Sequence, residues 1–255
     1  MPSKTFYITQ WIKNYFAKNG PNAKAVIGIS GGKDSTVAAA LCVNALGKDR
    51  VVGVLMPQDV QYDIDDSRRV CELLGIQSIE VDIGPACDRI YKAIDEAVYD
   101  NDATCRDNPM VATNTPARIR MTTLYAVAAM VGGRVCNTSN ASEVYVGYST
   151  KWGDGVGDFA PLRDFTVGEV LEIGHALGLP KDLVEKTPED GMSGKTDEEN
   201  MGIRYEDIDN VVRDHVHWVQ PDAYQAIEAR HRAAAHKANS VNIEHPSYLE
   251  WRYLD

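Results

Sequence analysis

Short apolar runs alternate with longer segments of helical period through the first 140 residues of the chain. Apolar runs that predict buried strands lie at residues 26–29, 51–56, 77–81 and 134–138. Segments of helical period lie at residues 5–18, 35–46, 63–74, 85–99 and 116–131. Buried strands separated by helices are typical of a parallel sheet with both faces covered. The pattern therefore predicts an α/β fold with a doubly wound parallel sheet and helices on both faces, which binds ligands at the carboxyl ends of its strands.

Beyond these elements the chain is predicted to consist of loops and helices. Stretches without a sustained period predict loops at residues 100–112, at the glycine-rich residues 147–162 and at residues 185–195. Thr166 and Glu169 have the spacing of a capping box, which opens a helix that we expect to end near residue 177. An acidic turn at residues 197–199 precedes helices at residues 205–218 and 221–239, which make the C-terminal third helical. We expect a single domain over residues 1–255, because no internal repeat is present and α/β units of this length are common.

Composition excludes several classes of protein. A net charge of −11 argues against binding to nucleic acid. No apolar run approaches the roughly 18 residues of a membrane span, and the first residues lack the pattern of a signal peptide, so we expect a cytoplasmic protein that does not enter a membrane. The five cysteines are scattered and form no C-x-x-C pair, which argues against a disulfide framework and a zinc site.

The clearest candidate for chemistry lies where the first predicted strand meets a glycine turn and a helix. Strand, tight turn and helix N-terminus together are typical of a phosphate site, because the backbone N–H groups and the helix dipole point at the anion. This is not a Walker loop, since only three residues separate Gly28 from Gly32 and Asp34 follows Lys33. Asp34 would repel phosphate unless a divalent cation lay between them, so it is a candidate Mg²⁺ ligand. An ordinary glycine turn with a solvated acid is the alternative.

Other candidates follow later strands. Met56, at the end of the second strand, is either an adenine contact or a core residue. Arg118 or Arg120 lies at the start of a mostly apolar helix. We expect such an arginine either to bind an anion or to be a surface arginine with a buried stem. Glu143 lies just past a strand end, where the site is expected, or acts only as an acid in the first turn of a helix. The glycine-rich loop carries charged residues, namely Lys151, Asp154 and Asp158.

The motif Ser-Gly-Gly-Lys-Asp-Ser at residues 30–35 resembles the pyrophosphate-binding loop of the N-type ATP pyrophosphatases. Further motifs resemble the NAD synthetase family within that superfamily: Asn-Thr-Pro-Ala-Arg-Ile-Arg-Met at 114–121, Asn-Thr-Ser-Asn-Ala-Ser-Glu at 137–143, Gly-Tyr-Ser-Thr-Lys-Trp-Gly-Asp-Gly-Val-Gly-Asp at 147–158, Thr-Asp-Glu-Glu-Asn-Met-Gly at 196–202, Tyr-Glu-Asp-Ile-Asp at 205–209, and His236-Lys237. The resemblance spans nearly the whole chain. Several motifs in the right order are much more specific than any one of them.

The resemblance implies an adenine nucleotide alpha hydrolase-like fold and ATP-dependent amidation of deamido-NAD to NAD. The deamido-NAD carboxylate attacks the α phosphorus of ATP, pyrophosphate leaves, and ammonia then displaces AMP from the adenylate. The resemblance also implies a homodimer. The nitrogen donor is free ammonia or a separate glutaminase partner, because a chain of this length leaves no room for an added glutaminase domain.

The same resemblance assigns residues to roles, motif by motif. The ATP contacts are Gly28, Ile29, Ser30, Gly31, Gly32, Lys33, Asp34, Ser35 and Thr138, to which we add Met56 from its position. The Mg²⁺ ligands are Asp34 and Glu143. The deamido-NAD contacts are Arg118, Lys151, Asp158, His236 and Lys237.

Two positions depart from the family pattern. Val167 stands where many members carry a lysine that contacts ATP, and Glu189 stands where many carry serine or threonine. Lys33 or Lys195 is a candidate for the missing positive charge. Two other functions therefore stay open: a different ATP pyrophosphatase that adenylates another acceptor, and a non-catalytic ATP-binding module.

Overall fold

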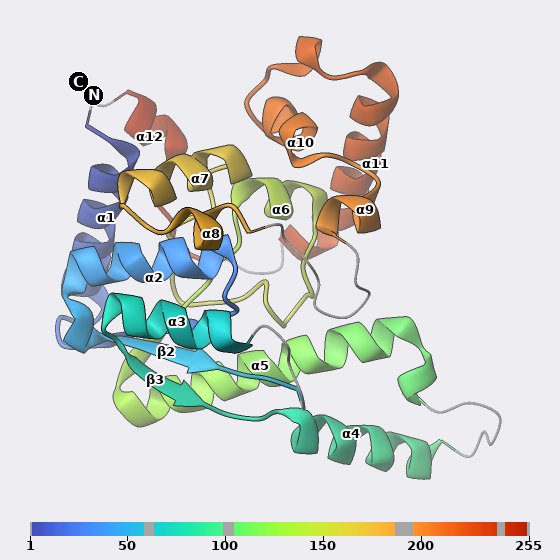
Figure 1. Cartoon of the computed structure of the whole chain (residues 1–255). Coiled ribbons are helices and arrows are strands. Elements are labelled where there is room, and N and C mark those ends of the chain that lie inside the picture. Colours follow the sequence, from blue (N-terminus) through green and yellow to red (C-terminus); the bar gives the residue numbers. More distant parts are fainter. Residues whose placement is uncertain (1, 59–63, 99–104, 187–195, 239–242, 254–255) are drawn as a thin grey trace.

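A four-stranded parallel sheet forms the centre of the computed structural model, which describes residues 2–58, 64–98, 105–186, 196–238 and 243–253 (Figure 1). Its strands are β1 (Lys24–Gly28), β2 (Val51–Leu55), β3 (Gln77–Glu80) and β4 (Gly133–Cys136), in the order β3-β2-β1-β4. The chain moves outward from β1 to β3 and then returns to the other side of β1. This reversal is what the doubly wound pattern predicted.

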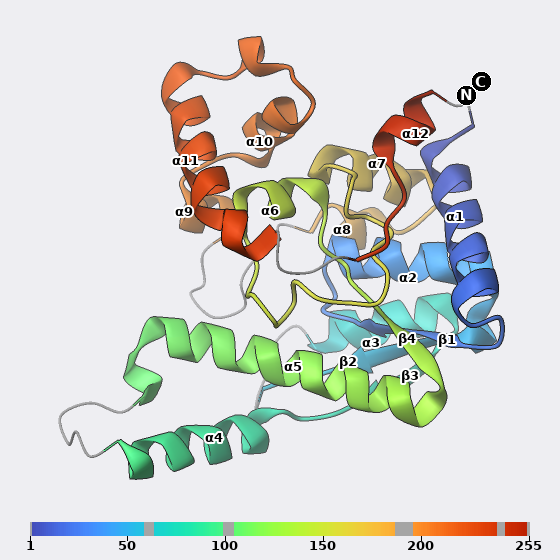
Figure 2. The same cartoon turned by 180° about the vertical axis from the view of Figure 1, so that it is seen from behind.

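Helices cover both faces of the sheet. One face lies under α1 (Lys4–Asn19), α2 (Lys33–Leu46) and α3 (Ile64–Leu74), and the other under α5 (Pro109–Val131) (Figures 1 and 2). Helix α4 (Gly84–Ala97) packs against α5 beyond the ends of the strands. The strands alternate between the two layers: Ala25 and Ile27 belong to the cluster with α1 and α2, whereas Val26 packs with Val127 of α5. Two further helices, α7 (Val167–Ala176) and α8 (Lys181–Val184), lie against α2.

The C-terminal third forms a helical region beside the sheet. Its helices are α9 (Asp197–Met201), α10 (Tyr205–Val212) and α11 (Pro221–Ala238), and α10 and α11 pack against α6 (Ala141–Val146) over a separate apolar cluster (Figure 2). The chain then returns to the sheet, where Ala160 N donates to Glu244 O at 3.0 Å. The last helix, α12 (Tyr248–Arg252), ends at the start of the chain, since Trp251 Nε1 donates to Pro2 O at 3.0 Å.

The predicted strands and most predicted helices are confirmed, with three corrections. Helix α5 begins at Pro109, so residues 109–112 are not a loop: the Asn108 side chain accepts from Met110 N, Pro109 occupies the first turn, and Pro116 lies inside the helix. A short 3₁₀ helix, η2 (Cys105–Asp107), precedes it. Residues 100–104 of that predicted loop lie outside the described part.

The other two corrections concern the C-terminal third. The acidic turn at 197–199 is the first turn of α9, which opens with a capping box between Thr196 and Glu199. The helix predicted over 205–218 ends at Val212, because Asp214 adopts a left-handed φ of 59°. A short 3₁₀ helix, η3 (Val216–Trp218), follows it. Another 3₁₀ helix, η1 (Lys48–Arg50), lies just before β2.

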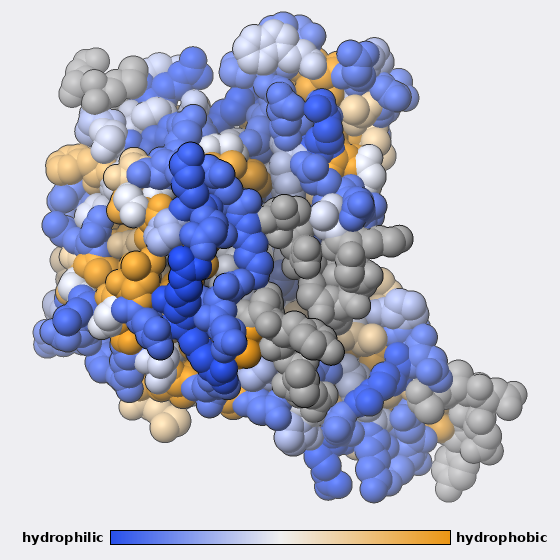
Figure 3. Space-filling view, viewed as in Figure 1, coloured by the Kyte–Doolittle hydropathy of each residue, from blue (hydrophilic) through white to orange (hydrophobic). Residues whose placement is uncertain are grey.

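The face in Figure 3 is largely hydrophilic over α3 and α8, where charged side chains pair across elements, as Arg68 does with Glu80 and Arg69 with Asp182. Among the described helices, none combines the length and the apolar character that crossing a bilayer requires.

Candidate active site

The carboxyl ends of β1 and β4 lie next to each other at the point where the strand order reverses. Strand β1 pairs in parallel with β2 on one side and with β4 on the other. Doubly wound sheets bind ligands at this position, because the loops leaving the two strands diverge and leave a crevice. The loop after β1 carries the predicted phosphate residues, and the loop after β4 carries Thr138 and leads to Glu143.

The loop after β1 is shaped for an anion. Gly31 has a left-handed φ of +78°, and a Cβ there would lie 2.8 Å from Asp66 Cβ, so two constraints require glycine. No side chain caps the N-terminus of α2 in the described chain, whereas α6, α7 and α9 each open with a capping box. Ser30 and Ser35 hold the turn, since their Oγ atoms lie 3.2 Å apart and Ser30 N donates to Ser35 Oγ. The first N–H groups of α2 are thus left for a phosphate.

Three of the other predicted ATP contacts lie at the same edge. Met56 is half-buried at the end of β2, and its Cε would be 3.3 Å from a Cβ on Gly28. Thr138 is half-buried two residues beyond β4. Ile29 is 4% exposed in the core and its N–H donates to Val54 O, so only its carbonyl is left for a ligand.

Asp34 and Glu143 are brought together through Asn140. Asn140 joins the elements that carry them: its Nδ2 donates to Asp34 Oδ1 at 3.0 Å, and its Oδ1 accepts from Glu143 N at 3.0 Å. Burial and the nearby negative charge of Asp34 raise the pKa of Glu143 well above its usual value, while Lys33 lowers it. Two carboxylates held together in a buried place repel each other, and a cation between them removes this repulsion.

These carboxylates suit Mg²⁺. Magnesium usually takes one or two protein carboxylates and completes its octahedron with water and substrate phosphates. The described residues contain no group of three metal-binding side chains, so the remaining ligands would come from ATP and water. Asp34 and Glu143 are therefore a fitting pair, and an ion held by them would lie beside the N-terminus of α2, where a phosphate would bind.

Sequence reasoning missed two members of this cluster. Asp197, at the start of α9, is 8% exposed and accepts from the hydroxyls of Tyr148 and Tyr205 at 3.0 and 3.2 Å. The Tyr205 ring lies over Lys33 Nζ, 5.5 Å from the ring centroid. Burial and the charges of Glu143, Asp197 and Asp34 raise the pKa of the Tyr205 hydroxyl. The signals in the sequence were the family motifs at 196–202 and 205–209, to whose residues no role was assigned.

A second cluster brings together four of the five predicted deamido-NAD contacts. Arg118 Nε donates to Lys151 O at 3.2 Å, and Lys151 Nζ donates to His236 O at 3.1 Å. Lys237 Nζ donates to Gly147 O and Ser149 O at 2.8 and 2.7 Å. The structure thus joins α5, the glycine-rich loop and the end of α11 into one basic surface.

The close approach of α11 to Gly147 makes this surface possible. Gly147 ends α6 with a φ of +66°, and a Cβ there would be 2.1 Å from Ala234 Cβ on α11. Any side chain at this position would push away the helix that carries His236 and Lys237.

Asp158, the fifth predicted contact, lies against the sheet instead. Its Oδ2 accepts from Val135 N of β4 at 2.7 Å, and its carbonyl accepts from Tyr15 Oη at 3.1 Å. These two bonds attach the end of the glycine-rich loop to β4 and to α1. Asp154 serves the same loop, since its Oδ1 accepts from Thr150 N at 2.8 Å; burial raises its pKa.

The two arginines in the middle of α5 point to different places, as their spacing predicted. Arg118 is part of the basic surface, whereas Arg120 points to the end of β2, where its Nε donates to Met56 O at 3.1 Å. Burial lowers the pKa of Arg120. Arg120 is therefore a cation held at the end of β2, at the edge of the crevice.

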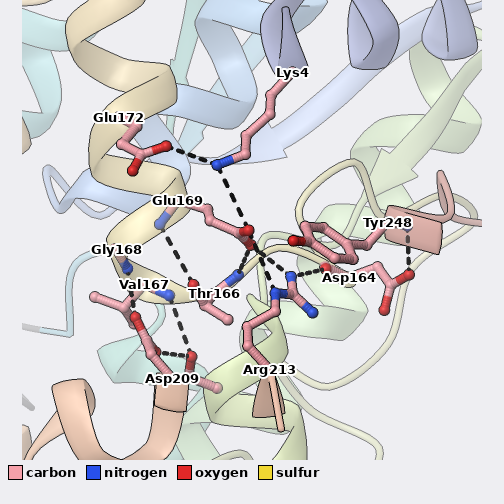
Figure 4. Close-up of polar contacts among 11 residues, drawn as sticks. Lys4, Asp164, Thr166, Val167, Gly168, Glu169, Glu172, Asp209, Arg213 and Tyr248 are labelled. Atoms are coloured by element: carbon pink, nitrogen blue, oxygen red, sulfur yellow. Dashed lines mark hydrogen bonds and ion pairs between the residues drawn. The ribbon is translucent and has the colours of Figure 1, made fainter. Parts of the chain in front are cut away.

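Position 167 carries no charge into the site. The Val167 side chain packs with Tyr205 in the apolar cluster of the helical region, and its N–H donates to Ser142 Oγ at 3.2 Å. Asp209 accepts from Gly168 N at 2.7 Å and from Ser142 Oγ at 2.5 Å (Figure 4). The first N–H groups of α7 are therefore already hydrogen-bonded within the protein.

Behind it, Glu169 binds Arg213 and Lys4, with Arg213 Nη2 at 2.5 Å and Lys4 Nζ at 3.5 Å (Figure 4). Asp164 extends this network, since its carbonyl accepts from Arg213 Nη2 and its Oδ2 accepts from Tyr248 N, both at 2.7 Å (Figure 4). These contacts fasten α7 to α1, α10 and α12. Glu189 and Lys195 lie outside the described residues, so Lys33 is the candidate cation that the structure places.

Comparison with known proteins agrees with this geometry. A family model described as NAD synthase matches residues 5–241. The NH3-dependent NAD+ synthetase of Pyrococcus furiosus is 41% identical over 198 residues, which cover 77% of this chain and 74% of that relative. A solved structure of an NMN synthetase from Francisella tularensis is 31% identical with a TM-score of 0.81, and the match covers 95% of this chain and 98% of that one. The NAD+ synthetase of Burkholderia pseudomallei superposes with a TM-score of 0.75 at 27% identity, covering 93% of this chain and 90% of that one. The chain therefore belongs to the NAD synthase family.

Proposed function

We propose that this protein is an ammonia-dependent ligase that amidates deamido-NAD to NAD at the expense of ATP, with release of AMP and pyrophosphate. One observation carries the proposal: Asn140 brings Asp34 and Glu143 together beside the N-terminus of α2, which no side chain caps in the described chain. This arrangement presents both a divalent cation and a row of N–H groups to a triphosphate. The relatives' names supply the product, NAD, and the nitrogen donor, ammonia, and the family resemblance supplies the acceptor.

The chemistry needs no nucleophile from the protein. A carboxylate oxygen of the acceptor attacks the α phosphorus, and the bond to the β-phosphate oxygen breaks, so that pyrophosphate leaves. Ammonia then attacks the carbonyl carbon of the adenylate and AMP leaves with the former carboxylate oxygen. The protein's task is to hold the reactants in line and to stabilise the negative charge that develops on phosphate.

The residues of the crevice suit these tasks. The loop at Ser30–Gly32 and the first N–H groups of α2 bind the leaving pyrophosphate. Asp34 and Glu143 would hold Mg²⁺, which neutralises phosphate charge when bound. Asn140 keeps the two carboxylates in place, because it hydrogen-bonds to Asp34 and to the backbone of Glu143 at once.

The basic surface suits an acceptor with phosphates of its own. Arg118, Lys151 and Lys237 converge there with His236, and deamido-NAD carries two phosphates in its pyrophosphate bridge. In a chain with a net charge of −11, such a local gathering of cations is what recruits an anionic substrate.

A second candidate acceptor is nicotinate mononucleotide, the acid form of NMN. It is favoured by the likeness to the Francisella tularensis NMN synthetase, which covers nearly all of both chains. The amidation chemistry would be the same, and only the part of the acceptor beyond its first phosphate would differ.

One assay tests both candidates. The protein is incubated with ATP, MgCl₂ and ammonium chloride, and with either deamido-NAD or nicotinate mononucleotide, and the products are separated by chromatography. We expect NAD, AMP and pyrophosphate in equal amounts from deamido-NAD. A larger kcat/KM for the mononucleotide would transfer the assignment to NMN synthesis, and ADP with orthophosphate as products would refute both.

The basic surface has a matched control. Lys237→Met should raise the KM for the acceptor while leaving the KM for ATP near its wild-type value. Lys13→Met, at an exposed position on α1, should change neither. Equal effects of the two substitutions would contradict the role of the basic surface.

We also expect a homodimer of single-domain chains, as the family resemblance implies. Exposed methionines along α5, namely Met110 and Met130, support an interface on this helix. Sedimentation equilibrium at micromolar concentration tests the expectation, and a monomer would contradict it. A separate glutaminase as nitrogen source remains a prediction.

A further inference from the structure

Lys33 is buried in a place where a lysine is unusual. Its side chain is 4% exposed, although it is the first residue of α2. Lysine is almost never buried to this extent unless its charge is paired, because removing an ammonium from water is costly. The partner is the neighbouring Asp34, whose Oδ2 lies 2.9 Å from Lys33 Nζ. The ammonium therefore rests on one of the two carboxylates that we assign to magnesium.

The surroundings of this ammonium are strongly acidic. Besides Asp34, the carboxylates of Glu143 and Asp197 interact with Lys33 electrostatically, and the face of the Tyr205 ring lies 5.5 Å from Nζ. Three carboxylates thus share one ammonium, which leaves a deficit of two positive charges when all are ionised. A divalent cation matches that deficit.

Both oxygens of Asp34 are already engaged. Oδ1 accepts from Asn140 Nδ2 at 3.0 Å, and Oδ2 pairs with Lys33. Asn140 is fully buried and caps α6 with its other amide atom, so its position is fixed by the fold. Lys33 is held only through a flexible side chain. When a metal ion binds Asp34, the group that gives way is the ammonium.

We propose that Lys33 is a built-in counter-ion of the Asp34–Glu143 pair, which occupies Asp34 before substrate binds and withdraws when magnesium enters with ATP. The inference rests on the proposed function, because it takes these two carboxylates as the magnesium ligands. Its consequence is that magnesium alone binds weakly, since it must displace a charge that is already paired. Magnesium that arrives with ATP brings phosphates that receive the displaced ammonium.

Binding of magnesium without nucleotide tests this role. Titration calorimetry of MgCl₂ into wild type, Lys33→Gln and Lys33→Met gives the affinity, and thermal unfolding in EDTA or MgCl₂ gives an independent readout. We expect Lys33→Gln to bind Mg²⁺ at least about tenfold more tightly than wild type, because no ammonium competes. We also expect both variants to unfold at lower temperature in EDTA and to regain stability with Mg²⁺ by mass action.

Lys4→Met is the matched control. Lys4 is 17% exposed, and its described ion pairs are with Glu169 and Glu172 of α7, not with Asp34 or Glu143. Its substitution should lower the unfolding temperature equally in EDTA and in MgCl₂. The same series in NaCl of matched ionic strength separates metal binding from screening.

Two results would overturn the inference: equal Mg²⁺ affinity in wild type and Lys33→Gln, or a recovery of stability that NaCl reproduces. If Lys33→Met does not fold in either solution, the affinity of Lys33→Gln decides, because its amide still donates to Asp34 without carrying charge. Failure here is distinct from failure of the proposed function. Wild type that makes NAD in the product assay while Lys33→Gln binds Mg²⁺ no better would refute only the counter-ion role.

Discussion

Replacing Gly147 with alanine tests how the fold holds the basic surface in place. The added Cβ would lie 2.1 Å from Ala234 Cβ, whereas ordinary contacts between such atoms start near 3.4 Å. Helix α11 would therefore have to move by roughly 1 Å or more, and overpacking of this kind costs about 1–3 kcal/mol. The left-handed φ of +66° adds about 1 kcal/mol of backbone strain for any residue with a Cβ. The expected loss of stability is thus about 2–4 kcal/mol.

Gly132 provides the matched control. It also has a φ of +66° and ends α5, but a Cβ there would have no neighbour within 4 Å. Gly132→Ala should therefore show only the backbone term of about 1 kcal/mol. The difference between the two variants isolates the contact with α11.

The assay is urea unfolding of both variants, together with steady-state kinetics. Because α11 carries His236 and Lys237, Gly147→Ala should also raise the KM for the acceptor, and Gly132→Ala should not. A compensating change, Ala234→Gly, removes the overlapping atom and should restore part of the stability of Gly147→Ala, with a coupling energy of about 1 kcal/mol or more. Equal destabilisation by the two alanine variants, with no coupling to position 234, would refute the argument.

Three further changes have expected outcomes. Asp34→Asn should lower turnover by at least about a hundredfold, because it removes a proposed metal ligand. It should also lower the free energy of unfolding by about 1–3 kcal/mol, because the buried Lys33 loses its charged partner. Initial rates and urea unfolding measure the two effects, and a fully active variant would show that Asp34 is not part of the site. Gly31→Ala should weaken ATP binding, measured by calorimetry, by at least about tenfold, or about 1.4 kcal/mol, because its Cβ would meet Asp66 and shift the loop; unchanged affinity would contradict the loop's assigned role. Thr166→Ala removes one half of a capping box and should cost about 1 kcal/mol in urea without changing the KM for ATP; a raised KM would mean that α7 contacts the nucleotide.

The strands and the position of the crevice could be predicted from sequence, because they depend on local patterns. A fully buried parallel strand is a continuous apolar run, and the order of strands and helices then places the ligand at the strand ends. The capping box at Thr166 and Glu169 is likewise a local signal, and it is confirmed.

The start of α5 was predicted too late for a local reason. Pro116 suggested the first turn of a helix, because proline is favoured there. Pro109 meets the same preference about two turns earlier in the same helix, with Asn108 as its N-cap. A proline inside a long helix is tolerated when packing holds the helix on both sides of it. Helix α5 packs on α4 and η2 before Pro116 and on β1 and β4 after it.

The surroundings of Lys33 could not be predicted from sequence. Lys33 and Asp34 are neighbours, but Glu143 and the Tyr205 ring come from α6 and α10, and their meeting depends on how the helical region packs beside the sheet. The role of Asp158 was hidden for the same reason, since its bond to Val135 N requires the glycine-rich loop to run back along β4.

The central claim is that the acceptor carboxylate attacks the α phosphorus of ATP in the crevice formed by Asp34, Glu143 and the N-terminus of α2. The most direct measurement uses deamido-NAD labelled with oxygen-18 in its carboxylate, incubated with ATP, MgCl₂ and ammonium, with mass spectrometry of the products. One labelled oxygen per AMP, together with unlabelled pyrophosphate, is the predicted result, because the oxygen that attacks phosphorus leaves with AMP. Label in orthophosphate together with ADP, or AMP without label, would contradict the account.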